Sequence, residues 1–282
     1  MTHKIDKKAI AIKGLMDWLL NQGSIRERKF CRRTILRRME PYWDELPKIE
    51  PTGEIYNVAI IDGVHVTGKT VLIMITPEFV VNFYICDSEC YETWIHLLKQ
   101  VAAPKFVVCD GGCGMLKAIH DAWSTTSIQR CHFHVKLNAK QHLTSRPTTE
   151  AGVEILQLVK DLFGIDTITK RDEWIDKLKK WGVKYDEFLK EITRVKSANS
   201  KRKWWYTHKN VRSCWHQLNS LVDNGTLFAY LEADGIKVPT TSNKIEGGIN
   251  KDIKRLVRCH SGLSQFHAMK LVELFLFSKS KF

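Results

Sequence analysis

Two apolar runs rich in β-branched residues constrain the fold of this chain more than any other feature. Residues 55–75 read IYNVAIIDGVHVTGKTVLIMI, in which a glycine-containing turn separates the runs and Asp62 lies late in the first run. Strands this apolar are usually buried on both faces of a sheet. An ionisable side chain there must be paired, protonated or bound to a cation. We therefore treat Asp62 as a candidate functional residue.

A second acidic residue ends another short apolar run. Residues 105–112 read KFVVCDGG, so Asp110 is followed by two glycines that leave backbone room beside its carboxylate. Two acids at strand ends suggest a shared metal site. Taken alone, each aspartate fits equally well as a strand-end residue that a turn or a helix N-cap satisfies.

The charge of the chain indicates a polyanionic partner. The 282 residues carry a formal net charge of +13 and are 44% hydrophobic, which is enough for a large core. Nucleic acid is the simplest partner for such a charge, although a ribosome-like or membrane-surface role fits it equally. The sequence has no apolar run of about 18 residues, and its first residues, MTHKIDKK, have no apolar signal-peptide core, so we expect a cytoplasmic protein without membrane spans. The eight scattered cysteines predict reduced thiols.

The N-terminal 50 residues predict two helices and a linker. Apolar residues at helical spacing predict a helix over 8–20, and a very basic stretch, SIRERKFCRRTILRRM, begins at Ser24. A break near residues 31–33 gives a helix-turn-helix-like segment whose second helix would enter a DNA groove. A solvated basic helix packed on the main domain is the alternative. The candidate DNA-binding residues here are Arg32, Arg33, Arg37 and Arg38.

The order of elements after this linker predicts the fold class. Strands over 55–65, 70–76 and 80–86 form an antiparallel meander, and a helix over 91–101 follows. Strands over 106–109 and 128–131 then alternate with helices that cover 114–123 and begin at His134. This is the order of an α/β ribonuclease H-like core. In that fold the first and fourth strands are neighbours, so Asp62 and Asp110 would lie side by side.

Two adjacent carboxylates suit a pair of divalent cations that bridge a phosphate. One ion activates the attacking oxygen and the other stabilises the leaving oxygen. Oxygen ligands favour Mg²⁺ or Mn²⁺, two ions per site, over zinc. Such a site normally needs a third acid.

From about residue 137 to 235 the pattern becomes helical and predicts an all-helical insertion, with helices over 153–163, 170–181, 185–194 and 210–223. Near its end, Lys201 and Arg202 precede Trp204 and Trp205, a mixture that suits backbone contacts and stacking on an unpaired base. Aromatic residues at helical spacing are otherwise core residues.

The segment PTTSNKIEGGINKDIKRLVR supplies the candidate third acid. Ser242 or Asn243 could cap a helix that carries Glu246. The cations Lys251, Lys254 and Arg255 follow on the same element as candidate DNA-binding residues.

Together these motifs resemble bacterial insertion-sequence transposases of the mutator type, which belong to the DDE superfamily. DGVHV, VVCDGGCGMLKAIHDAW, QRCHFHV and TTSNKIEGGINKDIKR occur in the order of that family, across about residues 15–280. The resemblance implies that Asp62, Asp110 and Glu246 are catalytic and bind the metal. It also implies that the helical block is the insertion domain between the second aspartate and the glutamate.

Three further residues are expected to support the active site. Cys131 and His134 match the family's Cys-x-x-His, and Asn243 lies three residues before Glu246. A zinc site that uses Cys86, Cys90, Cys109 and Cys113 is an alternative, but Cys131 and His134 alone are too few ligands to close one.

The predicted domains are a helical DNA-binding segment with its linker over 1–50, the first part of the catalytic core over 51–136, the all-helical insertion over 137–236 and the C-terminal part of the core over 237–282.

The resemblance implies a bacterial, nucleoid-associated DNA transposase that cleaves transposon ends and transfers the strand into target DNA. Its partners would be double-stranded DNA, both terminal inverted repeats and target, and further copies of the chain in a dimer or larger assembly. A ribonuclease H-like nuclease that cuts without joining, and a non-catalytic DNA-binding protein derived from a transposase, are the alternatives.

Overall fold

The structure is a computed structural model, and it describes residues 7–20, 33–34, 37, 40–50, 52–194 and 203–281. The chain divides into two compact units. The core unit comprises Met1–Lys105, Gly112–Thr126 and Asn243–Phe282, and the helical unit comprises Phe106–Gly111 and Ser127–Ser242. Each unit is therefore built from segments that are far apart in the sequence.

A five-stranded mixed sheet has the strand order β3-β2-β1-β4-β5. Its strands are β1 (Val58–Val66), β2 (Lys69–Ile75), β3 (Val80–Cys86), β4 (Phe106–Cys109) and β5 (Ser127–Arg130). β1, β2 and β3 form an antiparallel meander, and β4 pairs in parallel with β5. The predicted meander and the two later strands are thus confirmed, whereas the ribonuclease H-like assignment stays a prediction.

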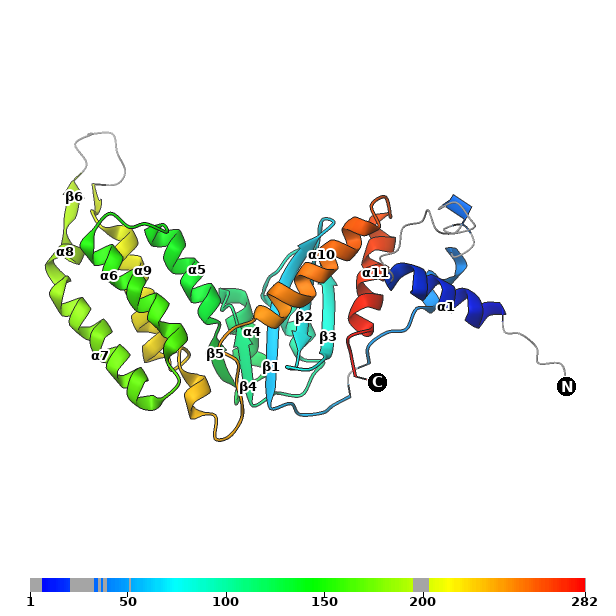
Figure 1. Ribbon diagram of the computed structural model, residues 1–282, viewed down its shortest axis with the longest axis horizontal. Coiled ribbons are helices and arrows are strands. Elements are labelled where there is room, and N and C mark those ends of the chain that lie inside the picture. Colours follow the sequence, from blue (N-terminus) through cyan, green and yellow to red (C-terminus); the bar gives the residue numbers. More distant parts are fainter. Residues whose placement is uncertain are drawn as a thin grey trace. The chain divides into compact units, whose positions relative to one another are not determined.

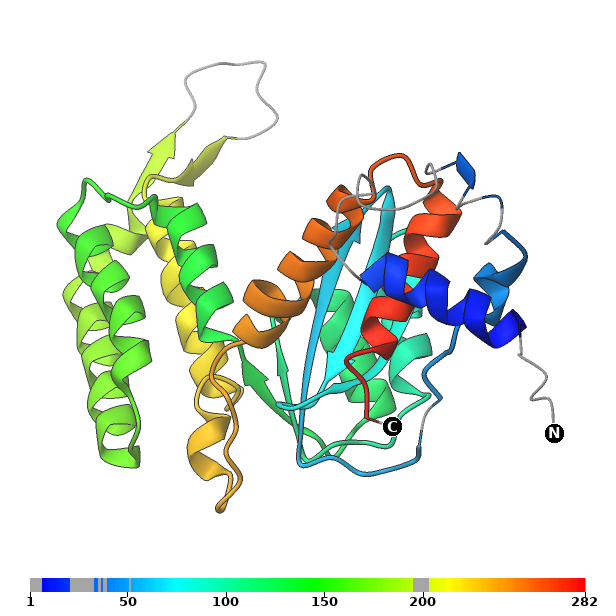
Figure 2. The ribbon, with the colours of Figure 1, turned by 45° about the vertical axis from the view of Figure 1, so that its right-hand side comes forward.

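In the core unit, helices cover both faces of the meander (Figures 1 and 2). α3 (Tyr91–Leu98) and α4 (Cys113–Ala122) pack on each other behind the strands. The π-helix η5 (Lys244–Ile249) continues into α10 (Asn250–Cys259), and α11 (Gln265–Phe277) follows. Six of the seven residues of β2 are buried, because both faces of this strand are covered.

The N-terminal segment packs on the C-terminal helices of the same unit. Helix α1 (Lys7–Leu20) contacts α11, and its Trp18 meets the His260 ring edge-on at 5.0 Å. In the 3₁₀-helix η2 (Glu40–Glu45), Trp43 is buried and stacks on His267 at a ring-centroid distance of 4.3 Å. The first predicted helix is confirmed. Most of the second lies outside the described residues, so the helix-turn-helix stays a prediction.

The helical unit packs its helices around a continuous apolar core (Figure 2). Its elements after β5 are α5 (His132–Leu143), α6 (Glu150–Asp161), η3 (Leu162–Gly164), α7 (Ile168–Lys184), α8 (Asp186–Lys190), β6 (Ile192–Arg194), β7 (Trp204–Tyr206), α9 (Lys209–Asp223) and η4 (Ala229–Glu232). Thr149 and Thr167 cap α6 and α7 by accepting hydrogen bonds from backbone N–H groups of the first turns. Across the described parts of both units, no helix has the length and apolar character that crossing a membrane requires.

The insertion is not all-helical, because it contains an antiparallel hairpin of β6 and β7. The helix predicted over 185–194 is wrong beyond Lys190, where α8 ends. Cross-strand pairing of Ile192 with Tyr206, together with the hydrogen bond between the hydroxyls of Thr193 and Thr207 at 2.9 Å, favours the extended form over another helical turn. These partners lie 14 residues further along the chain, outside the window of the helical pattern, so the local pattern did not indicate them.

Replacing Trp43 tests whether the N-terminal segment is an integral part of the core unit. Trp43→Ala removes a buried indole and its stacking on His267, so we expect the free energy of unfolding to fall by about 3 kcal/mol. Urea denaturation of the full chain measures this change. Tyr42→Ala, at a half-buried position of the same turn, is the control and should cost less. Equal losses in the two variants would contradict specific packing at Trp43.

Candidate active site

Asp62 is a buried carboxylate in the middle of an apolar sheet. It lies in β1 opposite Ile73 of β2 and is only 7% exposed. Most residues of this strand are buried, so the carboxylate has little access to solvent. A carboxylate in such a place needs a compensating donor or cation.

Asn250 supplies one compensating donor. Its Nδ2 donates a hydrogen bond to Oδ2 of Asp62 at 3.1 Å, across 188 residues of sequence. Asn250 is itself only 5% exposed, and within the described residues its Oδ1 is buried without a hydrogen-bond partner. A neutral carbonyl oxygen therefore lies next to the Asp62 carboxylate, and no described residue donates a hydrogen bond to it. The sequence indicated this residue only as part of a motif and gave it no role.

Glu246 lies on the element that faces this strand. It is in the π-helix η5, which contacts β1, and it precedes Asn250 by four residues. Residues four apart lie on about the same side of a helix. π-Helical turns are rare and occur often at functional sites. Glu246 is thus carried by the same helical segment that brings Asn250 to Asp62.

The predicted helix cap before Glu246 is wrong. Asn243 precedes η5 with helical backbone angles, makes no capping hydrogen bond with its side chain, and is exposed. Ser242 is buried instead, where its backbone N–H and hydroxyl donate to the sulfur of Cys131 at 3.2 and 3.3 Å. The start of η5 is therefore not determined by a side-chain cap.

Asp110 follows β4 directly and belongs to the helical unit. Its side chain is half-buried. Gly111 comes next with a φ of +82°, a left-handed conformation that favours glycine. The backbone carbonyl of Asp110 accepts a hydrogen bond from Nη2 of Arg130, at the end of β5. Arg130 was not among the residues that the sequence indicated.

The oxygen donors suit a hard cation. Asp62 offers a carboxylate and Asn250 an amide oxygen, which are ligand types that Mg²⁺ and Mn²⁺ accept. Within the described ranges, no group of three or more His, Cys, Asp or Glu side chains is arranged to hold a metal ion. Cys86, Cys90, Cys109 and Cys113, the residues of the alternative zinc site, are free thiols.

Cys131 and His134 lie at the start of α5. Cys131 precedes the helix and is fully buried, whereas His134 in its first turn is half-buried. Burial by itself raises the pKa of the Cys131 thiol, but hydrogen bonds from His134 and Ser242 outweigh it, so the net pKa lies below its ordinary value. The Cys-x-x-His motif thus joins α5 to the segment that leads to η5.

His132, between these two residues, was missed by the sequence reasoning. It is fully buried, and its Nε2 donates to the carbonyl of Leu227 at 2.9 Å. Gln129, also fully buried, donates to the same carbonyl and accepts from the backbone N–H of Tyr230. These bonds tie β5 and α5 to the end of the insertion. They span about 100 residues of sequence, so no local pattern indicates them.

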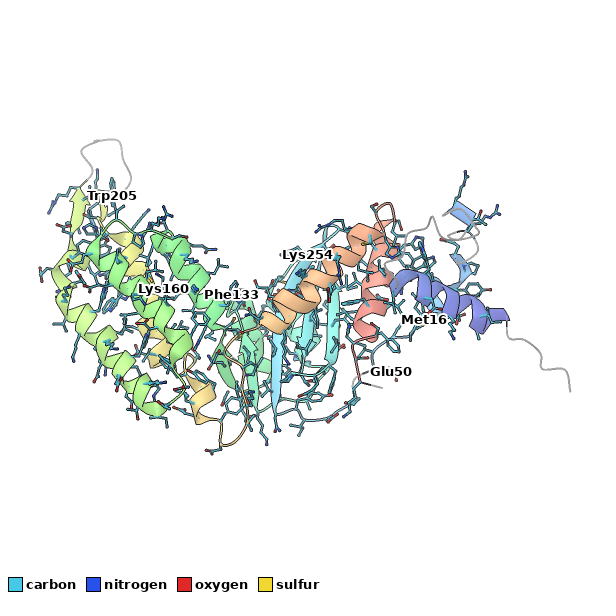
Figure 3. The ribbon with its side chains drawn as sticks, viewed as in Figure 1. Met16, Glu50, Phe133, Lys160, Trp205 and Lys254 are labelled. Atoms are coloured by element: carbon cyan, nitrogen blue, oxygen red, sulfur yellow. The ribbon has the colours of Figure 1, made fainter. Side chains whose placement is uncertain are left out.

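The predicted DNA-binding residues that the structure describes are exposed or nearly so. Arg33 and Arg37 are exposed, Trp204 and Trp205 are 47% and 39% exposed on β7, and Lys251, Lys254 and Arg255 are exposed on α10. Figure 3 labels Trp205 and Lys254. Arg255 forms an ion pair with Asp252 at 2.9 Å. Arg32, Arg38, Lys201 and Arg202 lie outside the described residues.

The buried histidine predicts acid sensitivity. Burial lowers the pKa of His132, only partly offset by its hydrogen bond to Leu227, so the unfolded chain takes up a proton near pH 6.5 while the folded chain resists it. The stability that this residue contributes is full above about pH 6.5 and is lost as the pH falls, with a slope of at most about 1.4 kcal/mol per pH unit. His132→Gln keeps a donor for Leu227 and cannot be protonated, so its free energy of unfolding should fall less between pH 7 and 5. Urea denaturation across this range measures the slope, and an unchanged slope would exclude His132 as its source.

The chain matches known transposases over its central part. Residues 77–200 match the family described as "Transposase, Mutator family". The transposase for insertion sequence element IS6120 of Mycolicibacterium smegmatis is 27% identical over 152 residues, which are 52% of this chain and 43% of that protein. The chain therefore spans less than half the length of this relative. On these matches, the similarity of the chain to mutator-type insertion-sequence transposases, which its motifs indicate, is confirmed.

Proposed function

We propose that the chain is a DNA transposase that cleaves transposon ends and joins them to target DNA by metal-dependent phosphoryl transfer. The observation that carries this proposal is the packing of η5 and α10 on β1. It brings the element with Glu246 against the strand with Asp62, although 184 residues separate the two acids in the sequence. The match to the Mutator family supports DNA as the substrate.

In this proposal Asp62, Asp110 and Glu246 are the acidic residues that hold two Mg²⁺ or Mn²⁺ ions. The ions would polarise the scissile phosphate and lower the pKa of the attacking hydroxyl. Asn250 restricts the rotation of the Asp62 carboxylate by donating a hydrogen bond to its Oδ2. The uncharged Oδ1 of Asn250 adds a hard oxygen beside that carboxylate without adding negative charge.

DNA contacts are proposed for two surfaces, one in each unit. On α10, Lys251, Lys254 and Arg255 form an exposed basic surface that would neutralise backbone phosphates. On the hairpin, Trp204 and Trp205 are successive strand residues, so they face opposite sides of β7, and both are exposed. Trp205 is labelled in Figure 3. Exposed indoles suit stacking on an unpaired base. Terminal inverted repeats and target DNA would be the substrates, and a dimer or larger assembly would hold paired ends.

Neutral variants of the three acids test the catalytic assignment. Asp62→Asn, Asp110→Asn and Glu246→Gln should each lower end cleavage by about 10⁴-fold, because each removes a negative charge that cation binding needs. Affinity for the end duplex, measured without divalent cation, should change little. Cleavage of a labelled transposon-end duplex with Mg²⁺ or Mn²⁺ gives the rates.

Glu89→Gln is the matched control for these variants. A Cβ on Gly63 would lie 2.8 Å from Oε2 of Glu89, so Glu89 is beside β1. Successive strand residues face opposite sides, which places Glu89 on the side away from Asp62. Its neutralisation should leave cleavage intact. Unchanged cleavage in any one of the three acid variants would remove that residue from the catalytic set.

The product of a precut end distinguishes the proposal from its alternatives. An end with a free 3′ hydroxyl gives a joined product only with a transposase, whereas a nuclease of similar fold gives cleavage alone. A non-catalytic DNA-binding derivative gives neither product.

The basic surface of α10 makes a prediction about salt dependence. Lys251→Ala and Lys254→Ala should each reduce the slope of log affinity against log salt concentration by about 0.9, because each would remove one phosphate contact. Fluorescence anisotropy with duplex DNA at several salt concentrations measures the slope. Lys105→Ala, an exposed lysine of the same unit outside α10, is the control and should leave it unchanged. Equal slopes in all four proteins would exclude α10 as the DNA surface.

A further inference from the structure

Arg130 is a buried cation at the same edge of the sheet as Asp110. It is the last residue of β5 and is only 8% exposed. Its register partner in the parallel strand β4 is Cys109, the residue before Asp110. Ligands of open α/β sheets bind beyond the carboxyl ends of parallel strands, which is where both side chains emerge.

The guanidinium of Arg130 is incompletely satisfied by the protein. Its Nη2 donates to the backbone carbonyl of Asp110, while its Nε is buried and has no hydrogen-bond partner in the described part of the chain. A buried guanidinium nitrogen without a hydrogen-bond partner is costly, which favours binding of an anion that is not part of the chain.

Gly111 provides the space that this guanidinium occupies. A Cβ built on Gly111 would overlap the guanidinium carbon of Arg130 and its adjoining nitrogens. Gly111 also has a φ of +82°. Two constraints therefore require glycine at the first position after Asp110. One is the left-handed backbone conformation, and the other is the Arg130 guanidinium that lies against this position.

We propose that Arg130 is a substrate-binding residue whose guanidinium contacts a phosphate oxygen of the DNA strand at the cleavage position. A guanidinium has five N–H donors in a planar fork that matches phosphate, and only one of its three nitrogens donates to a described residue. The inference rests on the proposed function for the identity of its substrate. It does not depend on divalent cations.

The alternative is that Arg130 only stabilises the loop at Asp110 through its hydrogen bond. In that case its substitution lowers the stability of the fold, but anions do not change the melting temperature. The two roles are therefore separated by measuring how phosphate, rather than substitution alone, changes the melting temperature.

The test measures the melting temperature of the full chain in inorganic phosphate and in chloride at equal ionic strength, with EDTA present. Phosphate should raise the melting temperature of the wild type and of Arg146→Gln, an exposed arginine in the same unit. Arg130→Gln should lose this rise, and Arg130→Lys should keep part of it because the charge remains. Each variant is compared with its own melting temperature in chloride, so a lower baseline does not obscure the result.

A second pair of variants moves the guanidinium without changing its charge. Gly111→Ala should lose the phosphate response because its Cβ displaces Arg130. Gly235→Ala should keep it, since Gly235 has a similar φ of +79° but open space around it. A phosphate response that survives in Arg130→Gln, or that is absent from the wild type, would overturn the inference. Because no divalent cation is present, this result is independent of whether the three acids catalyse cleavage.

With end DNA and Mg²⁺, Arg130→Gln should also weaken binding of the end duplex by about ten- to a hundredfold, the range for one charge-assisted hydrogen bond. Arg146→Gln should not. Unchanged end binding in Arg130→Gln would show that the anion site is not the DNA site.

Discussion

The burial of the Asp62 carboxylate is the constraint on which the core unit depends. A sheet strand that is apolar on both faces stabilises the fold by excluding water, and the same exclusion makes a charge in that strand costly. The amide of Asn250 offsets part of that cost, and it can do so only if η5 and α10 pack on β1. The C-terminal segment therefore completes the fold of a strand near the N-terminus, and it brings Glu246 with it.

Much of this architecture could be predicted because it follows from local periodicity. The three strands of the meander alternate with turns, β3 begins and ends at the predicted residues, and short apolar runs identify β4 and β5. Asp62 and Asp110 could be recognised because a charge in or after an apolar run breaks the pattern around it. Glu246 could be found only through the motif, because a glutamate among lysines and arginines is ordinary on a helix surface.

Long-range partners explain what the sequence reasoning missed. The extended conformation after Lys190 depends on pairing with β7, and Trp204 and Trp205 belong to that hairpin rather than to a helix. Asn250, Arg130 and His132 are polar residues whose importance comes from burial, and each reaches its partner across 20 to 188 residues. A polar residue in a basic segment looks like a solvated one until the fold shows which face it occupies.

Asp-Gly-Gly illustrates how a correct local interpretation was incomplete. The two glycines were expected to leave backbone room beside the carboxylate, and the positive φ of Gly111 agrees with a tight turn at that position. The structure adds that the space is filled by a side chain from the next strand. A larger residue at 111 would therefore strain the turn and also displace a buried cation from the edge of the sheet. The positions of Gly111, Arg130 and Asp110 depend on one another, because Arg130 can donate to the Asp110 carbonyl only while residue 111 has no side chain. This dependence is a physical reason for glycine at position 111, and the backbone conformation of the turn alone does not provide it.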